Sequence, residues 1–104
     1  MVFHLVLCRL RPDVSAATVE DMMRQTRIQL LKIPEVKIIR CGQRIGEGNW
    51  DFFVTLEFES MEKLQLYAAN PITHRYREEV LAPNVAQSST HDFELEPGKD
   101  PRFS

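Results

Sequence analysis

The longest regular hydropathy pattern in the chain extends from Asn49 to His74. Its first part presents one strongly apolar face at alternate positions, as a half-buried strand does: Trp50, Phe52, Val54, Leu56 and Phe58. Ser60 then offers an N-cap to a helix whose apolar residues recur at helical spacing: Leu64, Tyr67 and Ala68. Asn70-Pro71 is expected to end this helix and to begin another. The pattern predicts a strand with a helix pair folded back over its apolar face.

The rest of the chain predicts three further strands and one long helix. The strands are expected at residues 2–10, 36–45 and 88–96. A helix capped by Ser15 should extend to Pro34, and the short helix after Asn70 should continue to Leu81. This order, with right-handed crossovers, gives a ferredoxin-like βαββαβ fold of the α+β class, in which helices cover one side of a four-stranded antiparallel sheet.

The first strand is apolar on both faces, which has a consequence for assembly. One face carries Phe3, Leu5 and Leu7, and the other carries Val2, His4, Val6, Cys8 and Leu10. The helices cover only one face, and Phe53 and Ile39 are expected to add to the uncovered one. At roughly 25 cal/mol per Å² of apolar area, leaving several such side chains in water forfeits several kcal/mol. The pattern therefore predicts a homodimer in which a second copy covers the open sheet face.

The composition is that of an ordinary globular domain. The 104 residues, 43% of them hydrophobic, fit one domain over residues 1–96 followed by a polar tail at 97–104. The formal net charge of −2 shows no excess of basic residues of the kind that binds nucleic acid. No run approaches the ~20 apolar residues of a membrane span, and the first positive charges follow the first apolar run, the reverse of a secretory signal. We expect a cytoplasmic protein with no nucleic-acid or membrane partner.

Two sequence features are interpreted as structural. Cys8 and Cys41 lie in expected strands without a C-x-x-C spacing, so buried thiols are expected rather than a disulfide or a redox pair. The Gly46-Glu47-Gly48 stretch precedes a strand, whereas a phosphate-binding loop precedes a helix, so it predicts a hairpin loop.

The chain resembles the stress-responsive A/B barrel domain (Dabb) family of dimeric α+β barrels over nearly its whole length. Four segments carry the resemblance in the family's order: FHLVLCRLRPDVS, WDFFVTLEFESMEKLQLYAANP, THRYREEVLAP and HDFE. The resemblance implies a homodimer whose two sheets face each other across a barrel, with an open or filled pocket between each sheet and its helices. Most members have no assigned reaction, and some plant members resemble heat-stable stress proteins. One relative is a polyketide cyclase that uses a tyrosine and a histidine for an aldol-type ring closure.

The resemblance to that cyclase implies three site residues: His4 on the first strand, Tyr67 on the helix and Asp92 near the end of the chain. The family's His-Pro-x-His pattern is altered here. Asn70 stands in place of the first histidine, and one extra residue precedes the second, His74. One residue turns a helical side chain by about 100°, so His74 is offset from the direction of Tyr67.

His91 completes the candidate site residues, as a possible ligand contact beside Asp92. Histidine supplies general acid–base chemistry near neutral pH, and a tyrosine phenol can donate to a developing enolate. The structural alternative makes His4 a core histidine paired with Asp92 or a backbone carbonyl, with the Tyr67 hydroxyl at the rim and His74 in water. His91 and Asp92 are strand neighbours and point to opposite faces. No metal site is expected, because the three histidines show no local ligand spacing.

Two functions of different class remain open. The first is a non-enzymatic dimeric module that binds a small hydrophobic or aromatic ligand or acts in stress protection. The second is a cofactor-independent cyclase, isomerase or decarboxylase for a small aromatic or polyketide-like substrate, with Tyr67 and a histidine as acid and base. Neither requires a cofactor, and no residue marks the oxygen or haem chemistry of a monooxygenase. Three arginines suit either an acidic ligand or solvated surface positions: Arg9, Arg11 and Arg75.

Overall fold

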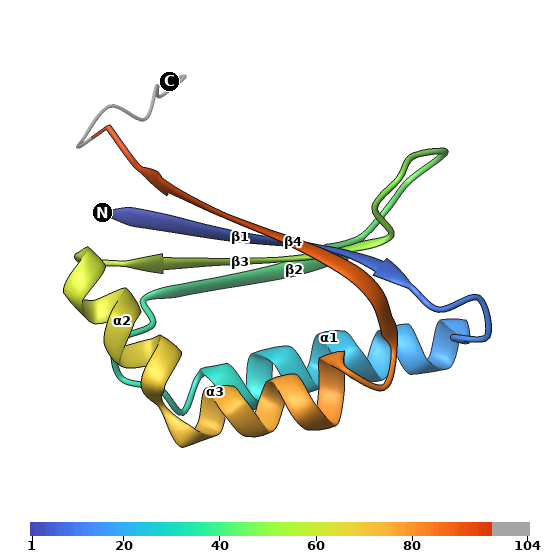
Figure 1. The fold of residues 1–104 in the computed structure, drawn as a ribbon, viewed down its shortest axis with the longest axis horizontal. Coiled ribbons are helices and arrows are strands. Elements are labelled where there is room, and N and C mark those ends of the chain that lie inside the picture. Colours follow the sequence, from blue (N-terminus) through green and yellow to red (C-terminus); the bar gives the residue numbers. More distant parts are fainter. Residues whose placement is uncertain (97–104) are drawn as a thin grey trace, which may run out of the picture.

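The computed structural model describes residues 1–96, in which one sheet is covered by helices (Figure 1). In chain order the elements are β1 (Val2–Leu10), α1 (Ala16–Leu30), β2 (Ile38–Gln43), β3 (Phe52–Phe58), α2 (Met61–Ala69), α3 (Pro71–Tyr76) and β4 (Val85–Glu94). A π-helical turn, Arg77–Leu81, extends α3. The polar tail expected at residues 97–104 lies outside the described residues. No helix within residues 1–96 has both the length and the apolarity to cross a membrane.

The four strands form one antiparallel sheet in the order β2-β3-β1-β4. β1 lies inside the sheet and pairs with both β3 and β4, so the two strand-helix-strand units interlock. All the helices lie on the same side of the sheet, and the other side is left open (Figure 1). The predicted ferredoxin-like α+β fold is confirmed.

Each predicted helix start is fixed by the side chain that the sequence indicated. Ser15 Oγ accepts a hydrogen bond of 3.1 Å from the backbone N–H three residues later, and Ser60 Oγ accepts one of 3.2 Å in the same way. Asn70 Oδ1 accepts from the backbone N–H two residues later at 2.9 Å. These bonds satisfy N–H groups that a helix start otherwise leaves without partners. The Asn70 cap also fixes the bend between α2 and α3.

Three of the four strands differ in their bounds from the expectation; β3 begins at Phe52 rather than Trp50, and β4 ends at Glu94 rather than at residue 96. β4 begins at Val85, three residues before the predicted start at Ser88, because its ladder with β1 continues across a bulge at the end of β1. Small and polar residues dominate the start of β4 and show no alternation. β2 is shorter than the predicted strand at 36–45, so the hairpin connection covers residues 44–51. Gly46 has a φ of 74° in this loop, in the left-handed region that favours glycine.

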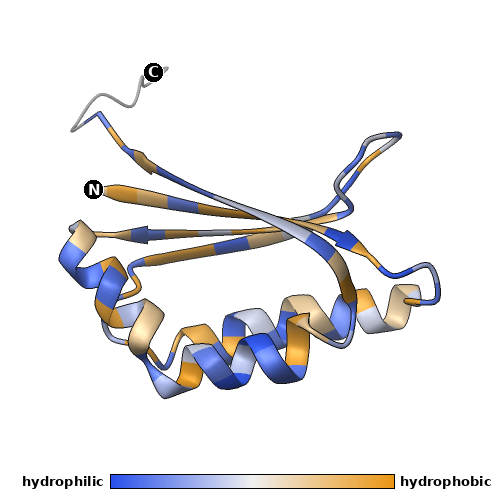
Figure 2. Ribbon diagram, viewed as in Figure 1, coloured by the Kyte–Doolittle hydropathy of each residue, from blue (hydrophilic) through white to orange (hydrophobic). Residues whose placement is uncertain are grey.

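The helix-covered face of the sheet holds the core. Its buried side chains include alternate residues of β1 and β3: Val2, His4, Cys8, Phe52, Val54, Leu56 and Phe58. Phe3, Leu5, Leu7 and Phe53 occupy the intervening positions and therefore lie on the open face, as predicted. The prediction for Ile39 was wrong, because Ile39 pairs with Leu56 and packs against the core, whereas its neighbour Ile38 lies on the open face. Hydrophobic residues extend along most of β1 (Figure 2).

Both cysteines are thiols without a disulfide partner, as expected. Cys8 is fully buried on the helix side of β1, and burial raises the pKa of its thiol to about 11. Cys41 is half-buried on β2. Burial also raises the pKa of this thiol, although the charge and a hydrogen bond of Arg27 act in the opposite direction. A buried, protonated thiol is a poor nucleophile, so Cys8 contributes packing rather than redox chemistry at neutral pH.

Candidate functional site

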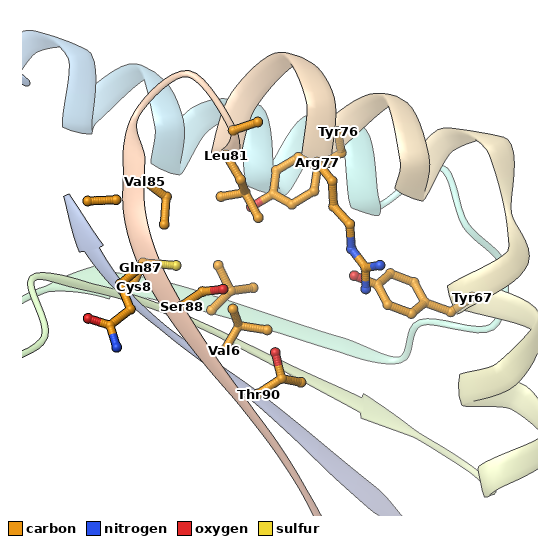
Figure 3. A pocket seen from close by; sticks show the side chains of 13 residues that line it. Val6, Cys8, Tyr67, Tyr76, Arg77, Leu81, Val85, Gln87, Ser88 and Thr90 are labelled. Atoms are coloured by element: carbon orange, nitrogen blue, oxygen red, sulfur yellow. The ribbon is translucent and has the colours of Figure 1, made fainter. Parts of the chain in front are cut away.

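A pocket of about 450 Å³ opens between the sheet and the helical segment that follows Asn70 (Figure 3). Helix-facing residues of β1 and β3 line it together with β4, the end of α2, the end of α3 and the π-helical turn. Six of the thirteen lining residues are aliphatic, and Cys8 adds a further apolar surface. The polar side chains among the lining residues are Tyr67, Tyr76, Arg77, Gln87, Ser88 and Thr90. Its volume and composition suit a small molecule with an apolar body and one polar end.

Tyr67 and Arg77 provide the polar end of this pocket. Tyr67 extends from α2 into the pocket, and the guanidinium of Arg77 lies beside its hydroxyl (Figure 3). Burial raises the pKa of Tyr67 above its ordinary value of 10.0, while the charge and a hydrogen bond of Arg77 act to lower it. The net direction is upward, so the phenol stays protonated at neutral pH. Tyr67 can therefore donate a hydrogen bond to a ligand oxygen, next to the positive charge of the exposed Arg77.

Tyr76 forms part of the wall between α3 and α1. Its hydroxyl and Thr26 Oγ1 are 2.7 Å apart and share a hydrogen bond, and Thr26 Oγ1 also donates to the carbonyl of Met22 at 2.7 Å. Because the Thr26 hydroxyl donates its proton to the Met22 carbonyl, Thr26 Oγ1 accepts the hydrogen bond from the Tyr76 hydroxyl. Burial raises the pKa of Tyr76, so it too is neutral. This bond holds the Tyr76 hydroxyl against α1. Tyr67 is therefore the tyrosine whose hydroxyl can bind a ligand beside Arg77.

His4 is paired with Asp92, as the structural interpretation expected. The two residues face each other across β1 and β4, and His4 Nδ1 donates to Asp92 Oδ1 at 2.5 Å. His4 is only 4% exposed, and its Nε2 has no hydrogen-bond partner within residues 1–96. Its ring packs edge-on against Tyr67, with 5.8 Å between the ring centroids. His4 is not among the residues that line the pocket, so Tyr67 stands between this pair and the pocket.

The structure does not bring His74 together with Tyr67. His74 is exposed on α3, while its neighbour Thr73 is fully buried and donates from Oγ1 to the Tyr67 carbonyl at 2.6 Å. The extra residue after Pro71 turns His74 away from Tyr67, because each residue rotates a helical side chain by about 100°. Thr73 occupies the inward position and His74 is directed to solvent.

His91 lies apart from the pocket. It pairs with Leu5 and so faces the open side of the sheet, whereas Asp92 faces the helices, as the alternation predicted. Its Nε2 is 2.6 Å from Ser89 Oγ, and its ring stacks on Phe93. Within residues 1–96 no cluster of three His, Cys, Asp or Glu side chains is arranged to hold a metal ion.

The sequence interpretation missed Arg77 and the polar residues of β4. Arg77 follows the buried Thr73 by four positions, so the helical period places both on one side of the helix. This four-residue spacing could have identified Arg77 only if Thr73, and not His74, had been taken as the residue that points inward. Thr90 and Ser88 share the helix-facing side of β4 with Asp92, from which they are two and four positions away, respectively. Alternation on the predicted strand was therefore enough to place them beside a site that includes Asp92.

Comparison with protein families gives one match that spans nearly the whole described chain. The family model described as "Stress responsive A/B Barrel Domain" matches residues 2–95. No curated protein matches the chain.

Several solved structures are similar to this chain. A dimeric ferredoxin-like protein of unknown function from Thermobifida fusca is 25% identical, with a TM-score of 0.81 and 90% of both chains covered. A dimeric protein of unknown function with a ferredoxin-like fold from Bacteroides fragilis is 24% identical, with a TM-score of 0.73, and the match covers 90% of this chain and 95% of that one. A hydroxynitrile lyase from Passiflora edulis has a TM-score of 0.80 at 14% identity, over 95% of this chain and 96% of that one. At such low identity the likeness to the lyase concerns the fold.

Proposed function

The chain belongs to the stress-responsive A/B barrel (Dabb) family, and on this basis we propose that it is a homodimer whose pocket binds a small hydrophobic or aromatic molecule. The observation that carries this proposal is the pocket of about 450 Å³ between the sheet and its helices. The pocket is open to solvent along β4, where Gln87, Ser88 and Thr90 are exposed, so a small molecule can enter it. A wall that combines aliphatic side chains with several polar groups, as here, can both bind a ligand and orient it.

The open sheet face supports the dimer. Its central strand carries Phe3, Leu5 and Leu7, with Phe53 beside them on β3, and Phe93 on β4 is 54% exposed. The Phe3 and Phe93 rings lie 6.5 Å apart, so the apolar surface continues from β1 to β4. An apolar sheet face of this kind is stabilised when it packs on another sheet. Two similar structures, from Thermobifida fusca and Bacteroides fragilis, are described as dimeric.

Filling the pocket tests the binding function. Ser88 lines the pocket from β4, opposite Cys8 in the strand register, and is itself exposed. Ser88→Trp should place an indole in the empty volume without displacing a core side chain, and we expect it to weaken binding of octanamide, a neutral apolar probe, by more than about tenfold. Calorimetric titration measures the affinity. Ser88→Thr is the matched control and should retain binding.

Two results would contradict the binding function. One is the absence of binding of both octanamide and its parent acid, octanoate, to the wild-type protein at millimolar concentration. The other is equal affinity in the wild type and in a folded Ser88→Trp variant, which would place the probe elsewhere.

A second candidate function is a cofactor-independent acid–base enzyme acting on a small aromatic or polyketide-like substrate, as a cyclase, isomerase or decarboxylase. The observation in its favour is the series Asp92, His4 and Tyr67, in which a carboxylate holds one imidazole nitrogen and the ring packs on the pocket phenol. With Nδ1 as the donor, Nε2 of the neutral imidazole is an acceptor. A carboxylate-oriented histidine of this kind is a common general base. In this candidate Tyr67 donates to the substrate oxygen and His4 serves as the base.

Turnover of β-keto acids and β-keto thioesters tests the second candidate. Tyr67→Phe removes the phenolic donor and keeps the ring, and His4→Ala removes the base. Both variants should lower the rate constant, whereas His74→Ala should leave it unchanged because His74 is exposed outside the pocket. Unchanged rates in both Tyr67→Phe and His4→Ala would exclude this function.

A further inference from the structure

Arg77 is the charged side chain of the pocket. It lines the cavity from the π-helical turn, and none of the other lining residues carries a charge. Within residues 1–96 no carboxylate forms an ion pair with it, although four other arginines or lysines have such partners. Its chain neighbours Glu78 and Glu79 are exposed and do not line the pocket. The pocket therefore has a positive charge without a compensating carboxylate.

The Tyr67 hydroxyl reinforces this charge as a second donor. Figure 3 shows the Arg77 guanidinium beside the Tyr67 hydroxyl, so both groups can reach the same ligand atom or the two oxygens of one acid. A guanidinium presents several N–H donors in a planar fork that matches the geometry of a carboxylate. Away from these donors, the side chains of Val6, Val54 and Leu81 provide apolar walls, and Gln87, Ser88 and Thr90 line the pocket from β4.

We propose that the pocket selects an organic carboxylate, whose acid group is held by Arg77 and Tyr67 and whose apolar body lies against Val6, Val54 and Leu81. This inference rests on the proposed binding function of the same pocket and adds the charge of the ligand. An amide of the same shape keeps the apolar contacts but lacks the charge, so the difference in affinity between acid and amide isolates the contribution of the ligand's charge. Charge-assisted hydrogen bonds are roughly twice as strong as neutral ones.

Octanoate and octanamide form the matched probe pair. We expect the wild-type protein to bind octanoate about tenfold or more tightly than octanamide in a calorimetric titration at low salt. Arg77→Gln should remove this preference by weakening octanoate binding while leaving octanamide binding within about twofold of the wild type. Arg75→Gln is the control, because Arg75 is an exposed arginine of α3 that does not line the pocket. It should leave both affinities unchanged.

The outcomes separate this inference from the binding function. Equal affinities for octanoate and octanamide in the wild type overturn the carboxylate preference. A preference that Arg77→Gln retains, or that Arg75→Gln loses to the same extent, overturns its assignment to Arg77. Each of these results leaves the binding function standing. Binding of neither probe contradicts the binding function, and the inference with it. Circular dichroism of both variants establishes that they are folded, and Arg77→Lys is a second variant that should keep part of the preference.

Discussion

Leu5→Glu is expected to convert the proposed dimer into a folded monomer. Leu5 lies in the middle of β1 and faces the open side of the sheet, with Thr55 and His91 as its cross-strand partners. In the dimer a glutamate here would lose its hydration, with the imidazole of His91 as its cross-strand neighbour, and burying a carboxylate costs several kcal/mol. Each 1.4 kcal/mol is a factor of ten, so the dissociation constant should rise by about a hundredfold or more. Leu5 is outside the buried core cluster of the helix side, so the chain itself should stay folded.

Analytical ultracentrifugation at micromolar concentration measures this change. Leu31→Glu is the matched control, since it makes the same substitution at a residue that is 72% exposed just after α1, in the helix layer. Leu31→Glu should remain a dimer, and circular dichroism should show the same secondary structure in all three proteins. A monomeric wild type, or a Leu5→Glu protein that dimerises as tightly as the wild type, would rule out the open face as the interface.

The sequence was sufficient for the fold wherever the deciding interaction is local. A capping side chain bonds to a backbone N–H within three residues, so Ser15, Ser60 and Asn70 could each be placed from their neighbours alone. The alternation of β1 and β3 likewise states which residues share a face. It does not state which of two adjacent apolar residues faces the helices when both are isoleucine. The register with β3 decides that Ile39 lies inside and Ile38 outside.

The site was less accessible to sequence reasoning because its geometry comes from tertiary packing. The pairing of His4 with Asp92 requires β4 to lie next to β1, and the topology rules supplied that neighbour. The pocket itself depends on small residues of β4, such as Ala86 and Ser88, leaving volume beneath α3. Small polar residues carry no periodic signal, so an empty volume cannot be recognised from them. The same limitation hid Arg77, whose importance depends on the cavity that it faces.

The second large effect is a loss of stability in alkaline solution that depends on Cys8. Burial raises the pKa of this thiol from an ordinary value of 9.0 to about 11, so the native state keeps the proton over a range in which the unfolded chain loses it. Stability falls with pH wherever the unfolded state binds fewer protons. The contribution of Cys8 is therefore complete below pH 9.0 and is lost as the pH rises toward about 11. The full loss is about 2.7 kcal/mol, of which about 1.3 kcal/mol falls between about pH 8 and pH 10.

Cys8→Ala isolates this effect because alanine does not titrate. Its cavity lowers the free energy of unfolding by a similar amount at every pH, whereas the slope of stability against pH should become shallower than in the wild type. Urea unfolding at one fixed protein concentration measures both slopes. Cys41→Ala is the control, since its thiol is only half-buried and Arg27 opposes the effect of burial, so it should change the slope less. Tyr67 and Tyr76 add their own loss above about pH 10, but both variants retain them and the comparison removes their contribution. Equal slopes in the wild type and Cys8→Ala would mean that water reaches the thiol through the pocket that Cys8 lines, and that the thiol is not shielded in solution.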